Sequence, residues 1–433
     1  MRSGKYHLVG VAGVGMNPLA QAIIAGGHTV TGSDRYADQG QDLEVLIKLQ
    51  GGGVRIFPQD GSGIDAATTA VVVSTAIEKD NPDLVAAARS GVPVIHRAAM
   101  LAELVAGHAC IAIAGTSGKT TVTGMAGYAL EQLGADPTVV DGGAVINWID
   151  ERHIGNVRRG AAGPWVIEAD ESDRSFLNFS PDWAVITNMS ADHFDMAETV
   201  RLFDQFRARV RTGIVDGSEP ALFDNFNPEL SARAIRFKYG GVDFEVPVPG
   251  RHNAENALQT AVLCERLGYP LPEIARALAG FRGIQRRLEL IGRGAVAVYD
   301  DYAHNPAKIA AAWRTLKPHY RRMTGVWRPH GFGPLRQMMD DLVTTFGREL
   351  RGDDQLHVLP VYYAGGTADN RVNSDTLVER LRAAGVRVHL DADFPAAESR
   401  IAAEVLPGDA VIVMGARDPE LPRAARRLAA RLA

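Results

Sequence analysis

Cysteine is scarce in the sequence, which contains only Cys110 and Cys264 among 433 residues. Both lie in apolar stretches, so we predict two free, buried thiols and no disulfide framework. The sequence also has no apolar run near the roughly 18 residues needed to cross a bilayer. An N-terminal apolar stretch follows Arg2 and Lys5, but glycines interrupt it, and we interpret it as a first strand and not as a signal peptide. These absences predict a cytoplasmic protein.

An excess of basic residues is absent as well, because 46 Lys and Arg stand against 51 Asp and Glu, for a formal net charge of -5. Proteins that bind nucleic acids or anionic membranes usually carry a basic surplus, so neither class is favoured. Hydrophobic residues make up 46% of the chain, which is enough to build several packed cores. At roughly 100 to 200 residues per domain, this length predicts two to four domains, and we expect three.

Short strand-like segments alternate with helical segments, which predicts parallel α/β sheets. In the first hundred residues the strand-like segments are 6–11, 28–34, 71–76 and 92–96. A second unit opens with a strand at 109–115 and an amphipathic helix that Gly134 should end. The segment after Phe281 is rich in glycine and arginine and predicts a linker to a third unit, with strands near 295–302, 356–361, 386–390 and 409–416. We therefore predict an α/β fold of three domains with Rossmann-like outer domains, at residues 1–107, 108–284 and 285–433.

The segment GTSGKTT, residues 115–121, lies between an apolar strand and an amphipathic helix and predicts a phosphate-binding loop. Backbone amides near glycines, together with the positive end of the helix dipole, suit a polyphosphate. Lys119 should reach the β and γ phosphates, and Thr120 should bind Mg²⁺. The general loop pattern has a glycine where Ile113 stands, so a chance match stays open. ATP is the favoured ligand, with Gly115, Thr116, Ser117, Gly118, Lys119, Thr120 and Thr121 as candidate contacts.

A second glycine cluster, Gly10, Gly13 and Gly15, follows the first predicted strand, and Asp34 stands about 20 residues further on. This arrangement suggests a dinucleotide site. The spacing is GxxGxG and not GxGxxG, so nicotinamide binding is weakly supported and any nucleotide diphosphate fits equally well. It also stays open that the glycines serve only helix–strand packing.

Polar side chains follow two strands of the predicted second unit. The first group comprises Glu168, Asp170, Glu171 and Asp173 in EADESD, and the second comprises Asn188, Asp192, His193 and Asp195 in TNMSADHFD. Carboxylates at a strand end suit Mg²⁺, although a solvated turn would show the same composition. Because ligands of such sheets bind beyond the carboxyl ends of the strands, two polar strand ends beside a phosphate loop favour one shared site.

Two further clusters stand later in the chain. In RHNAENA, His252, Asn253 and Asn256 share one face of a predicted helix start, where Asn253 could simply serve as the helix cap. In YDDYAHNP, a strand ends in Asp300, Asp301, Tyr302 and His304. A strand end crowded with polar side chains favours a site over a core position.

These motifs occur in the order found in the Mur ligases, and the resemblance covers nearly the whole chain. GVAGVGM, VVVSTAIEKDNP and VIHRAAMLAEL resemble the nucleotide-sugar domain of the alanine-adding members, whereas GTSGKTT, EADESD, TNMSADHFD and GRHNAENAL resemble the shared ATPase domain. DDYAHNP and VIVMGARD resemble the third domain. The resemblance implies a ligase that uses ATP and Mg²⁺ to join UDP-N-acetylmuramate to L-alanine through an acyl phosphate, in peptidoglycan precursor synthesis. It also implies small-molecule partners only, with no nucleic acid and no membrane, and a monomer or homodimer.

The resemblance assigns roles to individual residues. Lys119 and Thr120 would hold the γ-phosphate and a first Mg²⁺, Glu168 would bridge metals, and His193 would bind a second Mg²⁺. Arg287 in the linker would reach the γ-phosphate. Further implied contacts are Asn253, Asn256 and Asp301 for ATP, Tyr302 and His304 for the amino acid, and Gly13, Val14, Gly15, Met16, Ser33, Asp34, Ser74, Ala76, His96 and Arg97 for the UDP-sugar. The implied catalytic set is Lys119, Glu168, His193, Arg287 and His304.

The sequence departs from the alanine-adding pattern in several places. Ser117 and Asn305 stand where those members usually carry histidines. Gly331 and Pro334 replace arginines that help to hold the nucleotide sugar, and the stretch between residues 195 and 251 is shorter. These changes leave the ATPase expectation intact and keep open a sister ligase for a peptide or another specialised amine. A non-catalytic nucleotide-binding sensor and a nicotinamide dehydrogenase stay open as functions of a different class.

Overall fold

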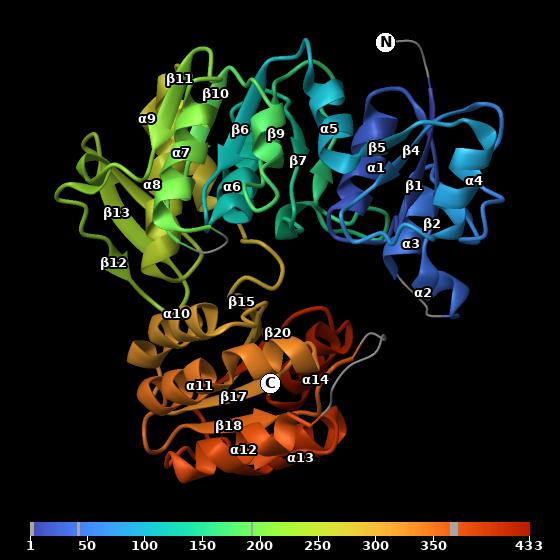
Figure 1. Ribbon diagram of the computed structural model, residues 1–433. Coiled ribbons are helices and arrows are strands. Elements are labelled where there is room, and N and C mark those ends of the chain that lie inside the picture. Colours follow the sequence, from blue (N-terminus) through green and yellow to red (C-terminus); the bar gives the residue numbers. More distant parts are fainter. Residues whose placement is uncertain (1–3, 41–43, 192–193, 364–370) are drawn as a thin grey trace. The chain divides into compact units, whose positions relative to one another are not determined.

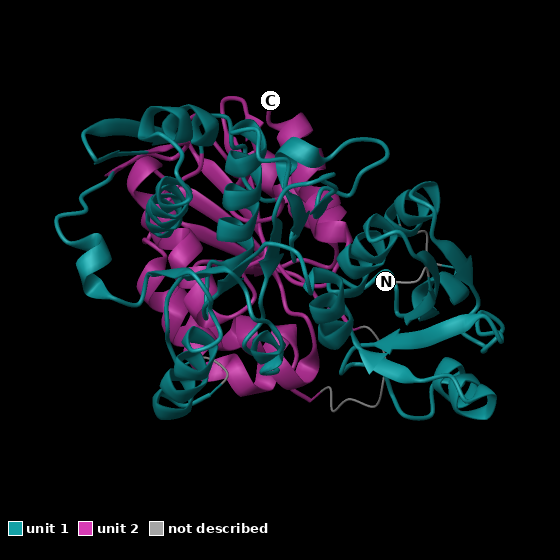
Figure 2. Ribbon diagram, turned by 90° about the horizontal axis from the view of Figure 1, so that it is seen from above, with its two compact units in different colours: residues 1–228, 236–247, 252–284 teal, residues 229–235, 248–251, 285–433 magenta. Residues whose placement is uncertain are grey.

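The computed structural model describes residues 4–40, 44–191, 194–363 and 371–433, and Figure 1 shows the chain with most of its helices and strands labelled. The chain forms two compact units, coloured separately in Figure 2. Unit 1 comprises residues 1–228, 236–247 and 252–284, and unit 2 comprises residues 229–235, 248–251 and 285–433. Whether unit 1 is two domains divided at residue 107 stays a prediction.

The first sheet of unit 1 has five parallel strands in the order β3-β2-β1-β4-β5. Its strands are β1 (Lys5–Val9), β2 (Thr29–Ser33), β3 (Arg55–Phe57), β4 (Thr68–Val73) and β5 (Val94–His96), and its helices are α1 (Met16–Ala25), α2 (Arg35–Asp38), α3 (Glu44–Gly51), α4 (Pro82–Ser90) and α5 (Arg97–Val105). The four predicted strands are confirmed, whereas β3 was missed because glycines before it and Pro58 after it indicate a turn. The strand order reverses at β1, so the glycines after β1 lie at the crevice where such sheets bind nucleotides.

The second sheet of unit 1 has the order β11-β10-β6-β9-β7-β8 and is parallel except for β8, which pairs antiparallel with β7. Its strands are β6 (Cys110–Ala114), β7 (Thr138–Val140), β8 (Val157–Arg158), β9 (Trp165–Glu168), β10 (Trp183–Ile186) and β11 (Gly213–Asp216). The helices of this part are α6 (Lys119–Gln132), α7 (Met196–Arg207), α8 (Arg251–Arg266) and α9 (Leu271–Ala279), with short 3-10 turns η1 (Ile146–Trp148), η2 (Ser175–Asn178) and η3 (Pro220–Phe223). A small sheet precedes α8 and contains β12 (Glu229–Leu230), β13 (Ile235–Tyr239) and β14 (Val242–Val246).

One buried apolar cluster runs through both large sheets of unit 1. It contains Leu8 of β1, Ala112 of β6 and Ile167 of β9. A hydrogen bond also joins the two parts, because Gln21 Nε2 donates to Asn156 Oδ1 at 3.0 Å. The strand ends of the two sheets therefore belong to one packed body.

Unit 2 contains one sheet of order β15-β16-β20-β17-β18-β19, parallel except for β15. Its strands are β15 (Glu289–Arg293), β16 (Ala297–Asp301), β17 (Met323–Arg328), β18 (Gln355–Val358), β19 (Val388–Leu390) and β20 (Ala410–Gly415). Its helices are α10 (Pro306–Leu316), α11 (Phe332–Glu349), α12 (Ser374–Ala383), α13 (Phe394–Glu404) and α14 (Glu420–Arg431), with the 3-10 turn η4 (Lys317–His319).

The sheet of unit 2 is buried on both faces. Along β20, Ile412 and Met414 belong to the core under α10, α11 and α12, whereas Val411 and Val413 belong to the core under α13 and α14. Alternate side chains of a strand point to opposite faces, so a continuous apolar strand fits a sheet covered by helices on both sides. The predicted linker ends in β15, which sequence analysis missed.

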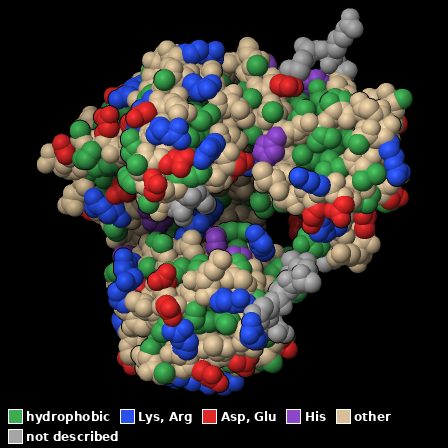
Figure 3. All heavy atoms as spheres, in the orientation of Figure 1, with side chains coloured by type: hydrophobic (Ala, Val, Ile, Leu, Met, Phe, Trp, Pro, Cys, Tyr) green, Lys and Arg blue, Asp and Glu red, His purple; other side chains and the backbone are tan. Residues whose placement is uncertain are grey.

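Two expectations from composition are borne out by the structure. Cys110 and Cys264 are free and buried, and burial raises the pKa of both thiols to about 12. Within the described ranges, no helix is both long enough and apolar enough to cross a bilayer. Basic and acidic side chains are interspersed on the visible face of each unit in Figure 3, in line with the small net charge.

Candidate functional site

The loop between β6 and α6 has a backbone that only glycine fits at two positions. Gly115 has φ +134° and Gly118 has φ +86°. A β carbon on Gly115 would lie 1.9 Å from Thr187 Oγ1, far inside van der Waals contact. Helix α6 begins directly after Gly118, so its positive dipole end faces the loop. The loop therefore has the shape and polarity predicted for a phosphate site.

The residues after β10 hold this loop in place. Asn188 Oδ1 accepts hydrogen bonds from Thr116 Oγ1 at 2.7 Å and from Ser117 N at 3.1 Å, and Asn188 Nδ2 donates to Ser117 O at 2.8 Å. Thr187 Oγ1 also lies 2.6 Å from Ser117 O, to which it donates. The sequence suggested Asn188 as part of a ligand-binding strand end. In the structure its amide positions the phosphate loop.

Lys119 lies at the start of α6 with its ammonium over the loop. Its Nζ donates to Gly115 O at 2.8 Å and to Glu171 Oε2 at 2.6 Å, and Asp170 Oδ1 lies 3.9 Å away. The acidic block after β9 therefore faces the phosphate loop, as the strand order requires. Ser117 is exposed and Thr121 half-buried at the two ends of the same turn.

Thr120 and Glu168, two of the predicted metal ligands, lie side by side. Thr120 Oγ1 donates to Glu168 Oε1 at 3.2 Å, and Gly142 N donates to Glu168 Oε2 at 2.9 Å. A hydroxyl and a carboxylate suit Mg²⁺, which takes few protein ligands beside water and phosphate. The third predicted ligand, His193, lies outside the described residues. Among those described, no group of three or more His, Cys, Asp or Glu could hold a metal by itself.

The glycine pair Gly142 and Gly143 was not predicted as part of the site. A β carbon on Gly142 would lie 2.6 Å from Glu168 Oε2, and one on Gly143 would lie 2.6 Å from Thr120 Cγ2. Only glycines let this backbone approach the candidate metal ligands. The available signal was the sequence DGG directly after the apolar β7, a strand end like those that were recognised.

The two asparagines of α8 also lie against the phosphate loop. A β carbon on Gly118 would lie 2.8 Å from Asn256 Oδ1, and Asn256 Nδ2 donates to Asn253 Oδ1 at 3.4 Å. The helix begins at Arg251, so Asn253 lies inside its first turn and a capping role is wrong. The predicted contact of both amides with adenine stays a prediction.

The glycine turn after β1 is fixed by Asp34. Asp34 Oδ2 accepts from Ala12 N at 3.0 Å, and Oδ1 accepts from Tyr36 N at 3.1 Å, at the start of α2. Gly13 and Gly15 stand in this turn, where Val14 is 71% exposed, and Met16 starts α1 as a buried side chain. The exposed backbone between the glycines is therefore the part of this turn that can meet a diphosphate.

Ser33 differs from the other candidates of this region, because its hydroxyl faces inward. Its Oγ donates to the buried Asp83 Oδ2 at 2.5 Å. Ser74 and Ala76 form a turn after β4, where Ala76 N donates to Ser74 Oγ at 3.4 Å. Contact of these three residues with a UDP-sugar stays a prediction.

Arg97 links the glycine turn to the acidic block. A β carbon on Gly15 would lie 3.2 Å from Arg97 Nη1, and Arg97 Nη2 lies 3.6 Å from both Asp170 Oδ2 and Asp173 Oδ2. The neighbouring His96 accepts a hydrogen bond at Nδ1 from Ala98 N at 3.3 Å, and burial lowers its pKa, so the neutral ring carries its proton on Nε2. The two candidate anion sites of unit 1 are thus connected through charged side chains.

In unit 2 the candidate residues gather at the end of β16. Asp301 is buried and accepts from Leu288 N at 2.7 Å and Ala303 N at 2.8 Å, and burial raises its pKa to about 6. The guanidinium of Arg287 lies 5.7 Å from the centre of the Tyr302 ring, within cation–π range. Asp301 therefore holds the linker backbone beside Arg287, and its predicted contact with ATP is not tested.

His304 follows in the same segment, and one of its nitrogens is free to accept a hydrogen bond. Nδ1 donates to Tyr302 O at 2.9 Å, because a carbonyl can only accept, so Nε2 keeps its lone pair. Burial lowers the pKa of His304 to about 4, and the neighbouring Lys308, His330 and Arg287 act in the same direction. The His330 ring lies 5.0 Å from the His304 ring and was not among the predicted site residues, although it follows β17 at a strand end.

Comparison with known proteins agrees with this arrangement. Three family models match successive segments: "Mur ligase family, catalytic domain" over residues 5–109, "Mur ligase middle domain" over 113–203 and "Mur ligase, glutamate ligase domain" over 286–417. A UDP-N-acetylmuramate–L-alanine ligase of Saccharopolyspora erythraea is 35% identical over 96% of this chain and 91% of its own length. The corresponding ligase of Caulobacter vibrioides is 35% identical over 96% and 94%. The chain belongs to the Mur ligase family.

Solved structures of other Mur ligases show the same architecture. The UDP-N-acetylmuramate-alanine ligase of Thermotoga maritima matches with a TM-score of 0.80 and 26% identity, over 99% of this chain and 98% of that one. A murein peptide ligase of Psychrobacter arcticus matches with a TM-score of 0.62 and 23% identity, over 99% of both chains, which supports the fold alone. The predicted three-domain α/β architecture is therefore confirmed.

The departures from the alanine-adding Mur ligase pattern have structural counterparts in unit 2. Asn305 caps α10, where its Oδ1 accepts from Lys308 N at 2.9 Å. Gly331 has φ +136° and precedes α11, and Pro334 lies in the first turn of that helix. Residues 331–334 consequently bring no charged side chain to the start of α11.

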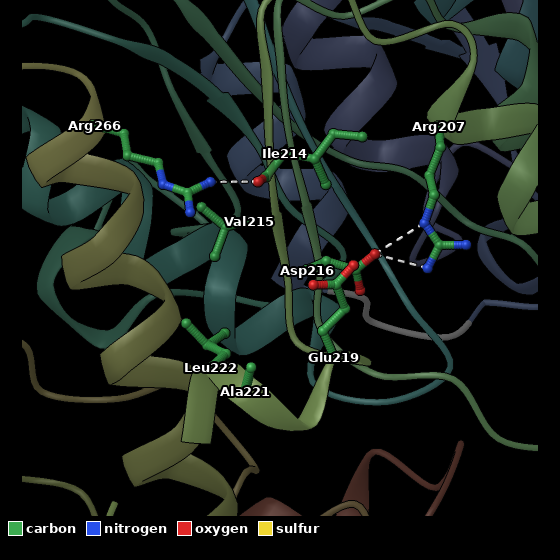
Figure 4. A pocket seen from close by; sticks show the side chains of 8 residues that line it. All are labelled: Arg207, Ile214, Val215, Asp216, Glu219, Ala221, Leu222 and Arg266. Carbon is green, nitrogen blue, oxygen red and sulfur yellow. Dashed lines mark hydrogen bonds and ion pairs between the residues drawn. The ribbon is translucent and has the colours of Figure 1, made fainter. Parts of the chain in front are cut away.

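A pocket of about 440 Å³ lies apart from these motifs, beside the edge strand β11 of this Mur ligase (Figure 4). Arg207 is paired with Asp216 at 2.7 Å, and Arg266 Nη1 donates to Ile214 O at 2.5 Å. Its lining residues are Arg207, Ile214, Val215, Asp216, Glu219, Ala221, Leu222 and Arg266. None of them belongs to the candidate motifs, and both arginines already have partners, so the site is defined by the strand ends and not by this pocket.

Proposed function

We propose that this chain is an ATP-dependent amide-forming ligase that joins the carboxylate of UDP-N-acetylmuramate to L-alanine through an acyl phosphate. The observation that carries the proposal is the grouping of Lys119, Thr120 and Glu168 around a phosphate loop that is shaped by glycines. Ligases of that name, matched over nearly their full length, support these substrates. ATP and a nucleotide sugar are cytoplasmic metabolites, so we propose the cytoplasm as the compartment and peptidoglycan precursor synthesis as the purpose.

The first step requires two anions to meet. The sugar-borne carboxylate must attack the γ-phosphate and displace ADP, so cations have to neutralise both groups and disperse charge in the transition state. Lys119 would bind the γ-phosphate, and Thr120 and Glu168, together with His193, would hold Mg²⁺. Bound Mg²⁺ supplies charge neutralisation and orients the phosphate oxygens. Arg287 of unit 2 would add a further positive charge to the same phosphate.

The second step is the attack of a neutral amine on the acyl phosphate, which forms the amide bond, breaks the bond between the acyl carbon and the phosphate oxygen, and releases inorganic phosphate and a proton. His304 suits this step because its Nε2 lone pair can accept a hydrogen bond from the amine and turn the nitrogen lone pair toward the carbonyl. Its pKa of about 4 keeps the ring neutral at physiological pH, so it does not repel an ammonium group on its way to deprotonation. Tyr302 would form the neighbouring wall for a small side chain.

A second candidate is a ligase of the same mechanism with another amine, such as a peptide. The observation that favours it is the start of α11, where Gly331 and Pro334 replace the arginines expected there. In their neighbourhood the rings of Phe332 and Tyr363 lie 5.4 Å apart, which offers an aromatic surface in place of charge. This candidate changes the acceptor and leaves the phosphate chemistry as proposed.

The test is to incubate the protein with UDP-N-acetylmuramate, MgATP and a mixture of amino acids and short peptides. ADP release and the mass of the product are measured. We expect a product heavier by one alanyl residue, and a product carrying another amine would select the second candidate. Binding of ATP without turnover on any acceptor would instead select a nucleotide-binding sensor.

The loop is tested with one pair of variants. Lys119→Ala should abolish ADP release, because the γ-phosphate loses its nearest protein cation. Lys238→Ala is the matched control, since Lys238 is an exposed residue of β13 whose partner is Asp243 at 3.4 Å. Full turnover by Lys119→Ala would contradict the role of the loop.

A further inference from the structure

One buried carboxylate beside the phosphate loop, that of Glu171, has no role in the proposed chemistry. Glu171 follows the proposed metal ligand Glu168 by three residues, yet its partner is Lys119, at 2.6 Å. The side chains of Lys119 and Glu171 are 12% and 3% exposed, whereas Asp170, at 3.9 Å from Lys119, is 35% exposed. Glu171 is thus the close and desolvated partner of the loop lysine.

The second oxygen of Glu171 shows how strongly this carboxylate depends on Lys119. Oε1 is buried and accepts no hydrogen bond from any residue in the described part of the chain. Burial raises the pKa of Glu171, and the charge and hydrogen bond of Lys119 oppose that effect. A buried carboxylate with one free oxygen is costly unless a cation stays beside it.

We propose that Glu171 is the resident counter-ion of Lys119 in the nucleotide-free loop, and that a nucleotide phosphate must displace it from the ammonium in order to bind. This inference rests on the proposed function, because it assumes that Lys119 binds a nucleotide phosphate. Glu171 is then a positioning residue that holds Lys119 ready, weakens nucleotide binding and speeds nucleotide release.

The charges give the direction of the effect. An ammonium has three N–H donors, and in this loop one goes to Gly115 O and one to Glu171. A phosphate that takes over Lys119 leaves Glu171 as an unpaired anion a few ångströms from other anions, where poor solvation strengthens repulsion. Part of the attraction between the phosphate and Lys119 is therefore used to offset the unfavourable energy of the unpaired Glu171, and the nucleotide binds more weakly. Weaker nucleotide binding would speed turnover where release of ADP is the slow step, because product release limits the turnover of many enzymes.

The experiment removes the charge and keeps the shape. In Glu171→Gln the amide oxygen can still accept a hydrogen bond from Lys119. The dissociation constant of MgADP is measured by calorimetry on the full chain, and ADP release by stopped flow. We expect MgADP to bind about tenfold more tightly, which is about 1.4 kcal/mol, to leave more slowly, and the KM for ATP to fall.

Two control variants separate charge from packing. Glu198→Gln removes a carboxylate of α7 that pairs with Arg174 and Arg201, and it should leave the MgADP affinity unchanged. Glu171→Asp keeps the charge and should not bind MgADP more tightly than the wild type. A merely structural role of Glu171 predicts the opposite pattern for Glu171→Gln, namely a lower melting temperature and weaker binding.

The outcomes are distinguishable. Equal or weaker MgADP binding by folded Glu171→Gln overturns the inference, whereas failure of the wild type to bind MgADP contradicts the proposed function itself. If Glu171→Gln does not fold, the smaller uncharged variant Glu171→Ser takes its place, with the same expected tightening and the same opposite result.

Discussion

Replacement of Asn188 by alanine should weaken nucleotide binding while the protein stays folded. The Asn188 carboxamide makes three hydrogen bonds to the phosphate loop, at 2.7, 3.1 and 2.8 Å. A typical intramolecular hydrogen bond contributes about 1 kcal/mol net, so the variant loses up to about 3 kcal/mol of support for the loop conformation. The loss is local, because the surrounding strands β6 and β10 keep their ladder.

This loss converts into affinity through the population of the competent loop. The apparent affinity equals the intrinsic affinity multiplied by the fraction of protein whose loop has the binding-competent conformation. Each 1.4 kcal/mol changes an equilibrium constant about tenfold. Three contacts of the loop with the segment after β10 remain in the variant: Thr116 N to the backbone oxygen of residue 188 at 3.1 Å, Thr116 Oγ1 to Ser190 Oγ at 2.8 Å, and Thr187 Oγ1 to Ser117 O at 2.6 Å. We therefore expect MgADP to bind between about tenfold and about a hundredfold more weakly.

The assay is calorimetric titration of MgADP together with thermal unfolding. Asn373→Ala is the matched control, because Asn373 Oδ1 caps α12 of unit 2 by accepting from Thr376 N at 3.1 Å. Loss of that cap should cost about 1 kcal/mol of stability and leave MgADP binding unchanged. MgADP affinity of Asn188→Ala within twofold of the wild type would refute the reasoning, since the loop would then hold its shape without the amide.

Three further changes test other parts of the site. Gly115→Ala should abolish MgADP binding, because its β carbon would lie 1.9 Å from a threonine oxygen at φ +134°, and binding by a folded variant would contradict this. Arg287→Ala should lose ADP release with an unchanged melting temperature, whereas the exposed Arg293→Ala should keep both, and unchanged turnover of Arg287→Ala would remove Arg287 from the site. The pKa of His304 in the folded protein, about 4, lies below the ordinary value of 6.5, so the unfolded chain takes up the proton first as the pH falls. The free energy of unfolding therefore decreases as the pH falls from 6.5 toward 4. His304→Gln should therefore show a smaller fall of melting temperature between pH 7 and about pH 4.5, and an identical fall would show that His304 does not cause it.

The local part of the site could be predicted because its chemistry lies in contiguous residues. The loop 115–121 shows its glycines, lysine and threonine at fixed spacing, and its position between an apolar strand and a helix is visible in the sequence. The strand-end carboxylate Glu168 could be placed nearby because ligands of α/β sheets gather at the carboxyl ends. Thr120 and Glu168 do lie 3.2 Å apart.

The supporting contacts could not be predicted, because they depend on strand order and register. Asn188 reaches the loop only because β10 is the neighbour of β6, with Ile186 opposite Ala114. Gly142 reaches Glu168 only because β7 is the neighbour of β9. The alternation of apolar and polar residues along one strand does not specify which strand lies beside it.

Short or ambiguous signals explain the errors. Among the strands that were missed, β3 stands between glycines and a proline that indicate a turn, and the glycine and arginine content of β15 resembles a linker. Asn253 has a residue type common at helix caps, but the helix begins two residues earlier, at Arg251. In each of these three cases the backbone hydrogen bonds of the folded chain, and not the local residue preferences, determine the secondary structure.

In the proposed mechanism the two units would contribute different residues to the reaction, which bears on its specificity. The phosphate loop with its replaced position Ser117, together with Thr120 and Glu168, belongs to unit 1, whereas the replaced positions Asn305, Gly331 and Pro334 belong to unit 2. Asn305 caps α10, and residues 331–334 are uncharged. In the proposed mechanism the activating step would depend on the charges around Lys119 and the amine step on the residues that receive the amine, so a different amine would be compatible with the same ATP chemistry. A changed acceptor should consequently appear as an ordinary MgADP affinity combined with an unusual amine profile.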